Sequence, residues 1–332
     1  MLNLVRNEWM KITKQTGTKV MIGLLILFVI ITGGIEKSIS SQIEQDRQQI
    51  AIQAEDKDKW KEELLLQIES SENFLNDPQL SKELTEVQKL YYEKDLAINT
   101  YRVENHLPEE LGNNVWRYMD NSKRNGITMV GLFMIIVAAG IVANEFTWGT
   151  IKLLLIRPTS RFQILLSKYI TVLSFGLMLL GILFVISALV GFVLFGSPSG
   201  NNVHLAYVDG NVIEEPMAWF IIKDYLLSLI GVLMTTTMAF MISTLFRNSP
   251  LAIGVALTSL LVGELVVEFL ALSFDWTKYI LFANTDLTTY TQLDSPLVQG
   301  MTLEFSIAVL AVYFIIFIVL AFIPFMKRDV GA

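Results

Sequence analysis

The chain has 332 residues, 53% of them hydrophobic, and its mean hydropathy is +0.51, more apolar than soluble domains. It contains no cysteine, which excludes disulfides, thiolate metal sites and thiol nucleophiles. The net charge of −7 comes from residues 36–124, which carry 12 Lys and Arg against 19 Asp and Glu, while the rest of the chain carries 13 of each. This local acidity gives no reason to expect a nucleic-acid partner.

The first residues predict a helix that lies in the membrane interface. Leu2, Val5, Trp9 and Ile12 fall on one face of a helix, and basic residues lie on its other faces. A basic amphipathic helix of this kind is typical of interfacial anchors, and we assign residues 1–18 to it. The alternative is an ordinary basic flank of the first span, which would not require an apolar stripe.

Six charge-poor runs are long enough to cross a membrane. A helix that crosses a hydrocarbon core of ~30 Å needs roughly 20 residues at ~1.5 Å each. The first run lacks a small-residue cleavage site and is predicted to be a retained anchor rather than a signal peptide. The predicted spans are residues 19–35, 125–144, 169–195, 225–246, 248–272 and 305–326.

Residues 36–124, between the first two spans, predict a helical hairpin outside the membrane. Apolar residues recur at three- to four-residue spacing, the tripeptide Asn-Asp-Pro at 76–78 interrupts them, and a second helical pattern follows from Leu80. The hairpin either packs against a partner's hairpin or is a solvated spacer. The predicted fold class is an all-α polytopic membrane protein with six transmembrane helices, an N-terminal interfacial helix and this external hairpin.

The distribution of bases predicts the orientation. An even number of spans places both termini on one side, and that side carries eleven Lys and Arg against three acids, whereas the opposite short loops carry two Lys against eight acids. By the positive-inside rule, both termini are cytoplasmic. The cytoplasmic segments are then residues 145–168 and the tail 327–332, and the external ones are the loop 196–224 and residues 273–304, which are extracellular or re-entrant.

Motifs for catalysis are absent from the sequence. It contains no P-loop, no Gly-x-Ser-x-Gly elbow and no His-Glu-x-x-His zinc motif. The two histidines, His106 and His204, fall in external segments and are predicted to be surface residues rather than metal ligands. We therefore expect that the chain is not an enzyme, holds no metal and binds no cofactor directly.

The connector between the second and third spans, residues 145–168, is apolar and basic. It carries four bases against one acid, and Pro158 interrupts it. A helix is expected from its first residue to Ile156, after which Thr159 or Ser160 caps the next helix. An apolar helix rimmed with bases fits a groove in a partner protein. The alternative is an interfacial loop whose bases contact anionic lipid.

The connector also carries a resemblance to a known family. Its sequence EFTWGTIKLLLIRPTSR is similar to the E-F-x-x-G-T-x-x-x-L-L-x-x-P-x-S-R stretch of ABC-2 type permeases. These are the membrane subunits of bacterial ATP-binding-cassette exporters, including bacteriocin, lantibiotic and bacitracin-resistance types. The layout of six spans, the interfacial helix and the missing P-loop agree, so the resemblance covers nearly the whole chain except the external hairpin.

The resemblance implies a function and a set of partners. The connector would be the coupling helix that rests in a cleft of a separate ABC ATPase, which supplies ATP and Mg binding. Two ATPase copies and a second permease subunit, in a homo- or heterodimer, would complete an exporter of the bacterial plasma membrane. The implied coupling residues are Glu145, Phe146, Gly149, Thr150, Ile151, Leu154, Leu155, Pro158, Ser160 and Arg161.

The cargo implied by the resemblance is an amphipathic peptide, an antimicrobial or a lipid-like molecule, and antibiotic or bacteriocin resistance is the associated role. Two other functions remain open. One is a non-transporting membrane sensor or scaffold whose external hairpin binds a ligand. The other is a secondary transporter, for which the chain lacks internal repeats and charged, broken helices in matching halves.

Two acids, Glu264 and Glu268, lie four residues apart on one face of the fifth predicted span. Counted from Leu251, they lie roughly 20 Å and about 26 Å along the helix. An acid at the membrane centre costs on the order of 3 kcal/mol, so it should face protein or water. The pair lines an export path or dimer seam, or else the helix breaks after Gly263 and both acids belong to an outer re-entrant segment.

Overall fold

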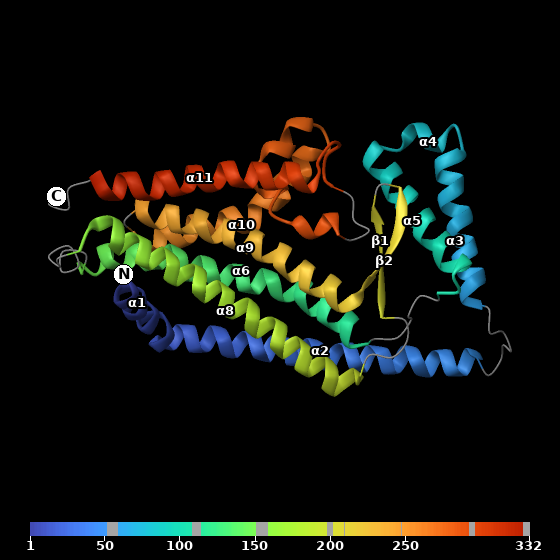
Figure 1. Cartoon of the computed structure of the whole chain (residues 1–332), viewed down its shortest axis with the longest axis horizontal. Helices are drawn as coiled ribbons and strands as arrows, with labels where there is room; N and C mark the ends of the chain where they lie inside the picture. The colour runs from blue at the N-terminus through green and yellow to red at the C-terminus, as the bar shows by residue number, and fades with distance from the viewer. Residues whose placement is uncertain are drawn as a thin grey trace.

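The computed structural model describes residues 1–51, 59–107, 114–150, 159–197, 202–208, 210–246, 248–291 and 296–327. Long helices lie side by side along most of its length, and a smaller group of helices and strands stands at one end (Figure 1). The N-terminus and the end of the last helix lie at the opposite end of the bundle. We call these two ends the hairpin face and the terminal face.

Among the described residues, six helices are long and apolar enough to cross a membrane, which confirms the predicted number. The chain is therefore a polytopic helical membrane protein. The six helices are α2 (Thr16–Ala51), α6 (Val115–Thr147), α8 (Arg161–Phe195), α9 (Met217–Phe246), α10 (Ser249–Ala271) and α11 (Leu303–Lys327).

Several of these helices are longer than the charge-free runs from which they were predicted. The helix α6 begins at Val115, where the Asn114 side chain accepts a hydrogen bond from the Arg117 backbone nitrogen, although the charge-free run begins only at residue 125. Lys123 and Arg124 lie inside the helix because charged side chains that leave the membrane or pair internally do not interrupt backbone hydrogen bonding. Charge therefore marks where a helix leaves the apolar layer, not where it ends.

The centre of the bundle is formed by α6 and α9, against which α8 packs, and α10 lies at its edge. In the most apolar 18-residue stretch of α9, 72% of residues are buried, against 17% in α10. Alanines of α6 such as Ala139 and aromatic side chains such as Phe175 and Phe240 are fully buried there. Small residues allow close helix approach in membranes, which explains why α6 and α9 pack tightly together.

The interfacial helix is α1 (Leu2–Lys14), and it packs against α8. Ile12 of its apolar stripe is 5% exposed, and the Trp9 ring meets the Phe175 ring edge-on at 6.5 Å between centroids. Leu2, at the start of the stripe, is 85% exposed. One end of the stripe is thus bound to the bundle, while the other remains open to the surroundings.

The external hairpin is present at the hairpin face. Its helices are α3 (Lys59–Asn76) and α5 (Glu86–Glu104), with the short α4 (Leu80–Glu83) between them. The rings of Phe74 and Tyr92 stack with centroids 4.7 Å apart and hold α3 against α5. The predicted helical hairpin is confirmed.

A small β-hairpin, which the sequence analysis did not predict, lies beside α5 (Figure 1). The strands β1 (Val203–Val208) and β2 (Asn211–Pro216) pair antiparallel, with Val208 opposite Asn211. The dipeptide Asp-Gly at 209–210 separates them, and Gly210 has a φ of 82°. An Asp-Gly pair between apolar runs is a strong signal for a β-hairpin. Residues 196–224 were nevertheless predicted to form only a loop.

The segment between α10 and α11 folds back into the bundle. It forms three short 3₁₀ helices, η1 (Asp275–Tyr279), η2 (Leu281–Ala283) and η3 (Leu287–Tyr290). A Cβ built on Gly231 of α9 would lie 2.2 Å from the Thr285 carbonyl oxygen, so the two backbones touch. Gly231 lies six residues, about 9 Å, inside the charge-free run of α9. We call residues 275–290, which fold back against α9 and α10, the re-entrant segment, and its depth in the membrane stays a prediction.

Candidate functional site

The first part of the connector belongs to the end of α6 at the terminal face. Glu145 and Phe146 lie in the last turn of α6, and the helix ends at Thr147. Gly149 follows with a φ of 71°, a left-handed conformation that glycine adopts without steric cost. The helix expected from Glu145 onward is therefore interrupted at Gly149.

The last part of the connector belongs to α8. Ser160 caps α8 as predicted, and its hydroxyl accepts a hydrogen bond from the Gln163 backbone nitrogen in a capping box. Arg161 begins the helix, and its Nη1 donates a hydrogen bond of 3.3 Å to the Met326 carbonyl oxygen at the end of α11. Four predicted coupling residues lie outside the described residues, so their contact with a partner stays a prediction. They are Ile151, Leu154, Leu155 and Pro158.

Four charged side chains meet where the two ends of the connector touch α1. Lys168 Nζ lies 2.8 Å from Glu8 Oε2 and 3.0 Å from Glu145 Oε1. Lys11 Nζ lies 2.9 Å from Glu8 Oε1 and 3.1 Å from Glu145 Oε1. Each base contacts both acids, so this charge cluster (Glu8, Lys11, Glu145 and Lys168) has no net charge and joins α1, α6 and α8.

Burial makes the charge cluster depend on all its members. The Lys168 side chain is 2% exposed and that of Glu145 is 11% exposed, whereas Lys11 reaches the surface at 49%. Partial burial acts to lower the pKa of Lys11, but Glu8 and Glu145 outweigh it and raise that pKa above its ordinary value of 10.5. A buried charge that loses its partner is strongly destabilising, so the cluster fixes the relative positions of three helices.

The structure turns two of the predicted coupling residues inward. Thr150 Oγ1 donates a hydrogen bond to Glu145 Oε2, which leaves the Glu145 carboxylate held by Thr150 and two lysines. Phe146 is partly buried against the core. Both Glu145 and Phe146 therefore hold the end of α6 in place, and neither side chain is presented outward to a partner.

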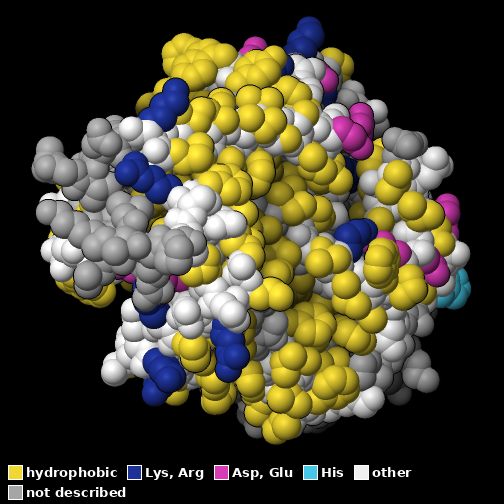
Figure 2. All heavy atoms as spheres, turned by 60° about the vertical axis from the view of Figure 1, so that its left-hand side comes forward, with side chains coloured by type: hydrophobic (Ala, Val, Ile, Leu, Met, Phe, Trp, Pro, Cys, Tyr) yellow, Lys and Arg dark blue, Asp and Glu magenta, His cyan; other side chains and the backbone are white. Residues whose placement is uncertain are grey.

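A groove of about 370 Å³ opens beside the charge cluster, between α1 and the start of α8. Figure 2 shows that Lys and Arg side chains are spread among apolar side chains on the terminal face. The groove offers a mixed polar and apolar surface next to the connector. It is lined by Leu4, Asn7, Glu8, Met10, Lys11, Lys14, Thr159, Ile164 and Ser167.

A second and larger cavity, of about 760 Å³, lies in the half of the bundle nearer the hairpin face. Its walls are formed by α6, α9, α10 and the re-entrant segment. Glu264 and Glu268 of α10 line it, together with Asp286 at the start of η3. We call it the acidic cavity. The two acids predicted within the fifth span thus share a site with a third acid from the re-entrant segment.

The helix α10 runs without a break from Ser249 to Ala271, so it does not end after Gly263 as one alternative proposed. A Cβ on Gly263 would lie 2.5 Å from the Phe282 ring, which shows that η2 packs directly on this turn. Glu264 is therefore part of a continuous helix, and its carboxylate lies roughly 22 Å from the first residue of α10 along the axis.

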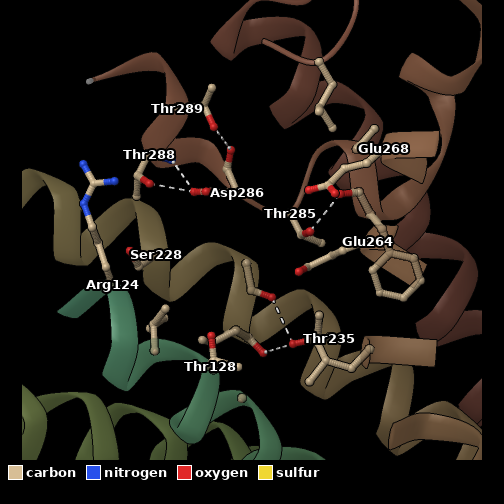
Figure 3. A pocket seen from close by; sticks show the side chains of 18 of the residues that line it. Arg124, Thr128, Ser228, Thr235, Glu264, Glu268, Thr285, Asp286, Thr288 and Thr289 are labelled. Carbon is tan, nitrogen blue, oxygen red and sulfur yellow. Dashed lines mark hydrogen bonds between the residues drawn. The ribbon is translucent and has the colours of Figure 1, made fainter. Parts of the chain in front are cut away.

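Figure 3 shows how the acidic side chains lie: those of Glu264 and Glu268 extend from α10 toward the open centre of the cavity, and Asp286 lies on another wall. Asp286 Oδ1 accepts hydrogen bonds from the Thr288 backbone nitrogen at 3.0 Å and its hydroxyl at 2.7 Å. The second carboxylate oxygen of Asp286 has no hydrogen bond among the described residues. Three carboxylates thus surround one space.

A buried ion pair closes the acidic cavity on the side of α6 and α9. Lys123, 2% exposed, bonds to Asp224, and the other oxygen of Asp224 accepts a hydrogen bond of 3.2 Å from Thr291 Oγ1. Beside it, Arg124 Nε lies 3.3 Å from Asp120 Oδ2. The bases of this wall therefore have acids of their own outside the three carboxylates of the cavity.

Sequence reasoning missed several residues of both sites. Glu8 and Lys168 are 160 positions apart and Lys123 and Asp224 are 101 apart, so no local pattern pairs them. One signal was present: Glu8 is the only acid before the first span. A single acid in a basic interfacial helix is a candidate for an internal ion pair.

Comparisons with known proteins place the chain in a family. A family model described as "Protein of unknown function (DUF2705)" matches residues 85–331. The chain is 47% identical over 335 residues to "Uncharacterized protein YhcI" of Bacillus subtilis, with both proteins covered in full. It is 35% identical over 203 residues to "Uncharacterized membrane protein YdbK" of the same species, over 59% of this chain and 76% of YdbK. The chain therefore belongs to the DUF2705 family and, with its six apolar helices, is a multi-pass membrane protein.

Proposed function

We propose that this chain is the permease subunit of an ATP-driven ABC-2 type exporter. Two permease subunits, identical or different, would combine with two copies of a separate ATPase in the bacterial plasma membrane, with both termini cytoplasmic. ATP and Mg would bind to the ATPase subunits. The exporter would move an amphipathic molecule outward, and a role in resistance to an antibiotic or bacteriocin would follow from such cargo.

The observation that carries this proposal is the charge cluster at the ends of the connector. Glu145 opens the connector and Lys168 closes it, and the two side chains are bonded to each other and to α1. A force applied to the connector would thus reach α6, α8 and α1 together. A loop that only touches lipid would not need its two ends tied to a third helix by buried charges.

The expected drive mechanism follows from that geometry. Closure of the ATPase subunits on nucleotide would push on the connector, in which the resemblance assigns Glu145 to Arg161 to the coupling contact. Because Arg161 is also bonded to the end of α11, the push would reach the last helix as well. The helices would then move as a connected group, which is the kind of rigid-body rearrangement that alternates access across a membrane.

The test is whether an ATPase subunit without its own membrane domain co-purifies with the tagged chain. We expect the isolated chain to show no ATP hydrolysis and the complex to hydrolyse ATP. A catalytically dead variant of the ATPase subunit controls for contaminants. ATP hydrolysis by the chain alone, after that control, would contradict the proposal.

The second candidate function is that of a non-transporting membrane sensor, and contacts at the hairpin face support it. Tyr101 Oη donates a hydrogen bond of 3.2 Å to Glu214 Oε1, and Trp116 Nε1 donates one of 3.0 Å to Asn202. These contacts link the external hairpin to the β-hairpin and α6, so a ligand bound outside would be felt by the bundle. Recovery of a signalling protein and no ATPase in the same co-purification would favour this role.

A further inference from the structure

We infer that the acidic cavity is a binding site for a small cationic amphiphile, a molecule with a positively charged nitrogen group on an apolar body. The inference deepens the proposed export function and rests on it only for the claim that the bound molecule is cargo. Binding itself depends on the cavity alone.

The charge of the cavity carries the first step. Glu264, Glu268 and Asp286 face its interior from two walls (Figure 3). Among the described residues, none of the three carboxylates lies within 4 Å of a lysine or arginine nitrogen. The two bases of the lining, Lys123 and Arg124, pair with Asp224 and Asp120 instead. The cavity therefore presents negative charge that the protein itself leaves uncompensated.

The position of Glu264 within a membrane-crossing helix also favours a cationic ligand. It lies within a continuous membrane-crossing helix, where a carboxylate is unfavourable unless water or an opposite charge accompanies it. Residues of this kind line the paths of polar or charged substrates. A cation entering the cavity would offset the cost, and an anion would be repelled.

The spacing of the acids decides between a metal ion and an organic cation. Within the part of the chain that the structure describes, no three Asp, Glu or His side chains are close enough to hold one metal ion. The cavity instead measures about 760 Å³, within the range of roughly 300–1,000 Å³ that is typical of small-molecule sites. Its size fits an organic molecule whose charge is shared among separated carboxylates.

The rest of the lining requires that this molecule be amphiphilic. Apolar side chains from every wall contact the same space as the acids, and the hydroxyls of Ser228 and Thr235 are already bonded to backbone carbonyls of α9. A purely hydrophilic cation would leave this apolar surface uncovered. The apolar lining includes Ile127, Val232, Leu260, Leu265, Phe282 and Met301.

Two glycines hold the re-entrant segment against the helices of the cavity wall. Gly231 and Gly263 allow Thr285 and Phe282 to approach α9 and α10 more closely than any side chain at these positions would permit. This approach brings Asp286 into the same space as Glu264. The third acid thus lies on a segment that packs closely against these two glycines.

The experiment measures binding of rhodamine 6G, a cationic amphiphilic dye, by fluorescence anisotropy. The purified chain is placed in phosphatidylcholine nanodiscs, and empty nanodiscs give the lipid background. The uncharged dye Nile red serves as the neutral probe. The variants are Glu264→Gln/Glu268→Gln and Asp286→Asn, and Glu304→Gln, at an exposed acid of α11 outside the cavity, is the matched control.

We expect the double variant to weaken rhodamine 6G binding by about tenfold or more, because two of the three negative charges that attract the cation are removed. Asp286→Asn should weaken it to a smaller extent, and Glu304→Gln should leave it unchanged. Nile red binding should be the same in all four proteins. Thermal unfolding confirms that each variant is folded. If the double variant does not fold, Asp286→Asn still tests the inference, because Asp286 lies on a separate wall of the cavity.

The inference would be overturned by unchanged rhodamine 6G binding in the cavity variants, by an equal loss in Glu304→Gln, or by a parallel loss of Nile red binding. Displacement of the dye by Mg²⁺ but not by dodecylamine would also overturn it and assign the acids to an inorganic cation. The assay contains no ATPase, so its outcome is independent of the co-purification test. Dye binding without an ATPase partner would leave the site standing and remove the export function.

Discussion

Lys168 Nζ lies 3.0 Å from Glu145 Oε1, and this ion pair joins the two ends of a connector 23 residues apart. The same ammonium group reaches Glu8 of α1, so the start of the chain is fastened to the connector. Because Lys168 is almost fully buried, this contact is a buried ion pair rather than a surface ion pair. It turns a stretch between two membrane helices into a fixed part of the terminal face.

The first prediction concerns the buried ion pairs of Lys168. Lys168→Met would leave the carboxylates of Glu8 and Glu145 with only the half-exposed Lys11, and we expect a loss of about 3 kcal/mol in stability. The measurement is thermal unfolding of the detergent-purified protein. Glu145→Gln in the same background should restore part of the loss, because it removes one uncompensated charge. Lys14→Met, at an exposed position of α1, is the control and should have little effect.

The second prediction tests the coupling role of the connector. If Leu154 fills an apolar cleft of the ATPase, Leu154→Asp buries an unpaired carboxylate at a cost of several kcal/mol. Each ~1.4 kcal/mol weakens binding about tenfold, so ATPase co-purification should be lost while the abundance in the membrane stays normal. Arg157→Ala removes a rim charge and should cost roughly 0–1 kcal/mol. Full ATPase binding by Leu154→Asp would make the connector a lipid-facing loop.

The third prediction tests the orientation. The chain has no cysteine of its own, so the labelling of a single introduced cysteine reports on that position alone. Ser70→Cys, exposed on α3, should react with a membrane-impermeant maleimide in intact cells. Lys14→Cys, exposed on α1, should react only after the cells are opened. Labelling in the reverse order would place the terminal face outside the cell.

The fourth prediction concerns the contact of the re-entrant segment with α9. In Gly231→Ala the new Cβ would lie 2.2 Å from the Thr285 carbonyl oxygen, and that backbone cannot yield without leaving α9. We expect a loss of about 1–3 kcal/mol, as for other overpacked sites, together with weaker rhodamine 6G binding. Gly181→Ala, where a Cβ meets nothing within 4 Å, is the matched control and should be neutral or slightly stabilising.

The fifth prediction is a pH dependence at the hairpin face. Burial lowers the pKa of His204 below its usual 6.5, against the opposing effects of Glu215 and the Thr291 carbonyl, while Lys223 acts in the same direction as burial. The unfolded chain therefore binds the proton more readily, and the stabilising contribution of the neutral ring is complete above pH 6.5 and is lost as the pH falls through the lower folded-state value.

Thermal unfolding at about pH 7.5 and about pH 5.5 measures this contribution. Wild-type protein should lose more stability over this interval than His204→Gln, in which the ring stacked on Phe220 is removed. His106→Gln, at an exposed position, controls for the loss of an imidazole. An identical pH dependence in wild type and His204→Gln would contradict the assignment.

The sequence by itself determined the parts of this protein that depend on neighbouring residues. Apolar runs longer than a membrane core specified six helices, the break at residues 76–78 specified the external hairpin, and Ser160 specified the start of α8. Each of these signals acts within a few turns of one helix. The sequence pair Asp-Gly at 209–210 is a signal of the same local kind, because it indicates the β-hairpin without information from distant residues.

Only the tertiary structure decided which charges meet. The bond between Lys168 and Glu8 depends on how α1 folds back onto α8, and no spacing along the chain encodes it. Asp286 joins Glu264 because the re-entrant segment descends between α9 and α10, which requires the absence of a side chain at Gly231. Hydropathy sets how many helices cross the membrane, but close packing between helices distant in sequence sets where buried charges find their partners.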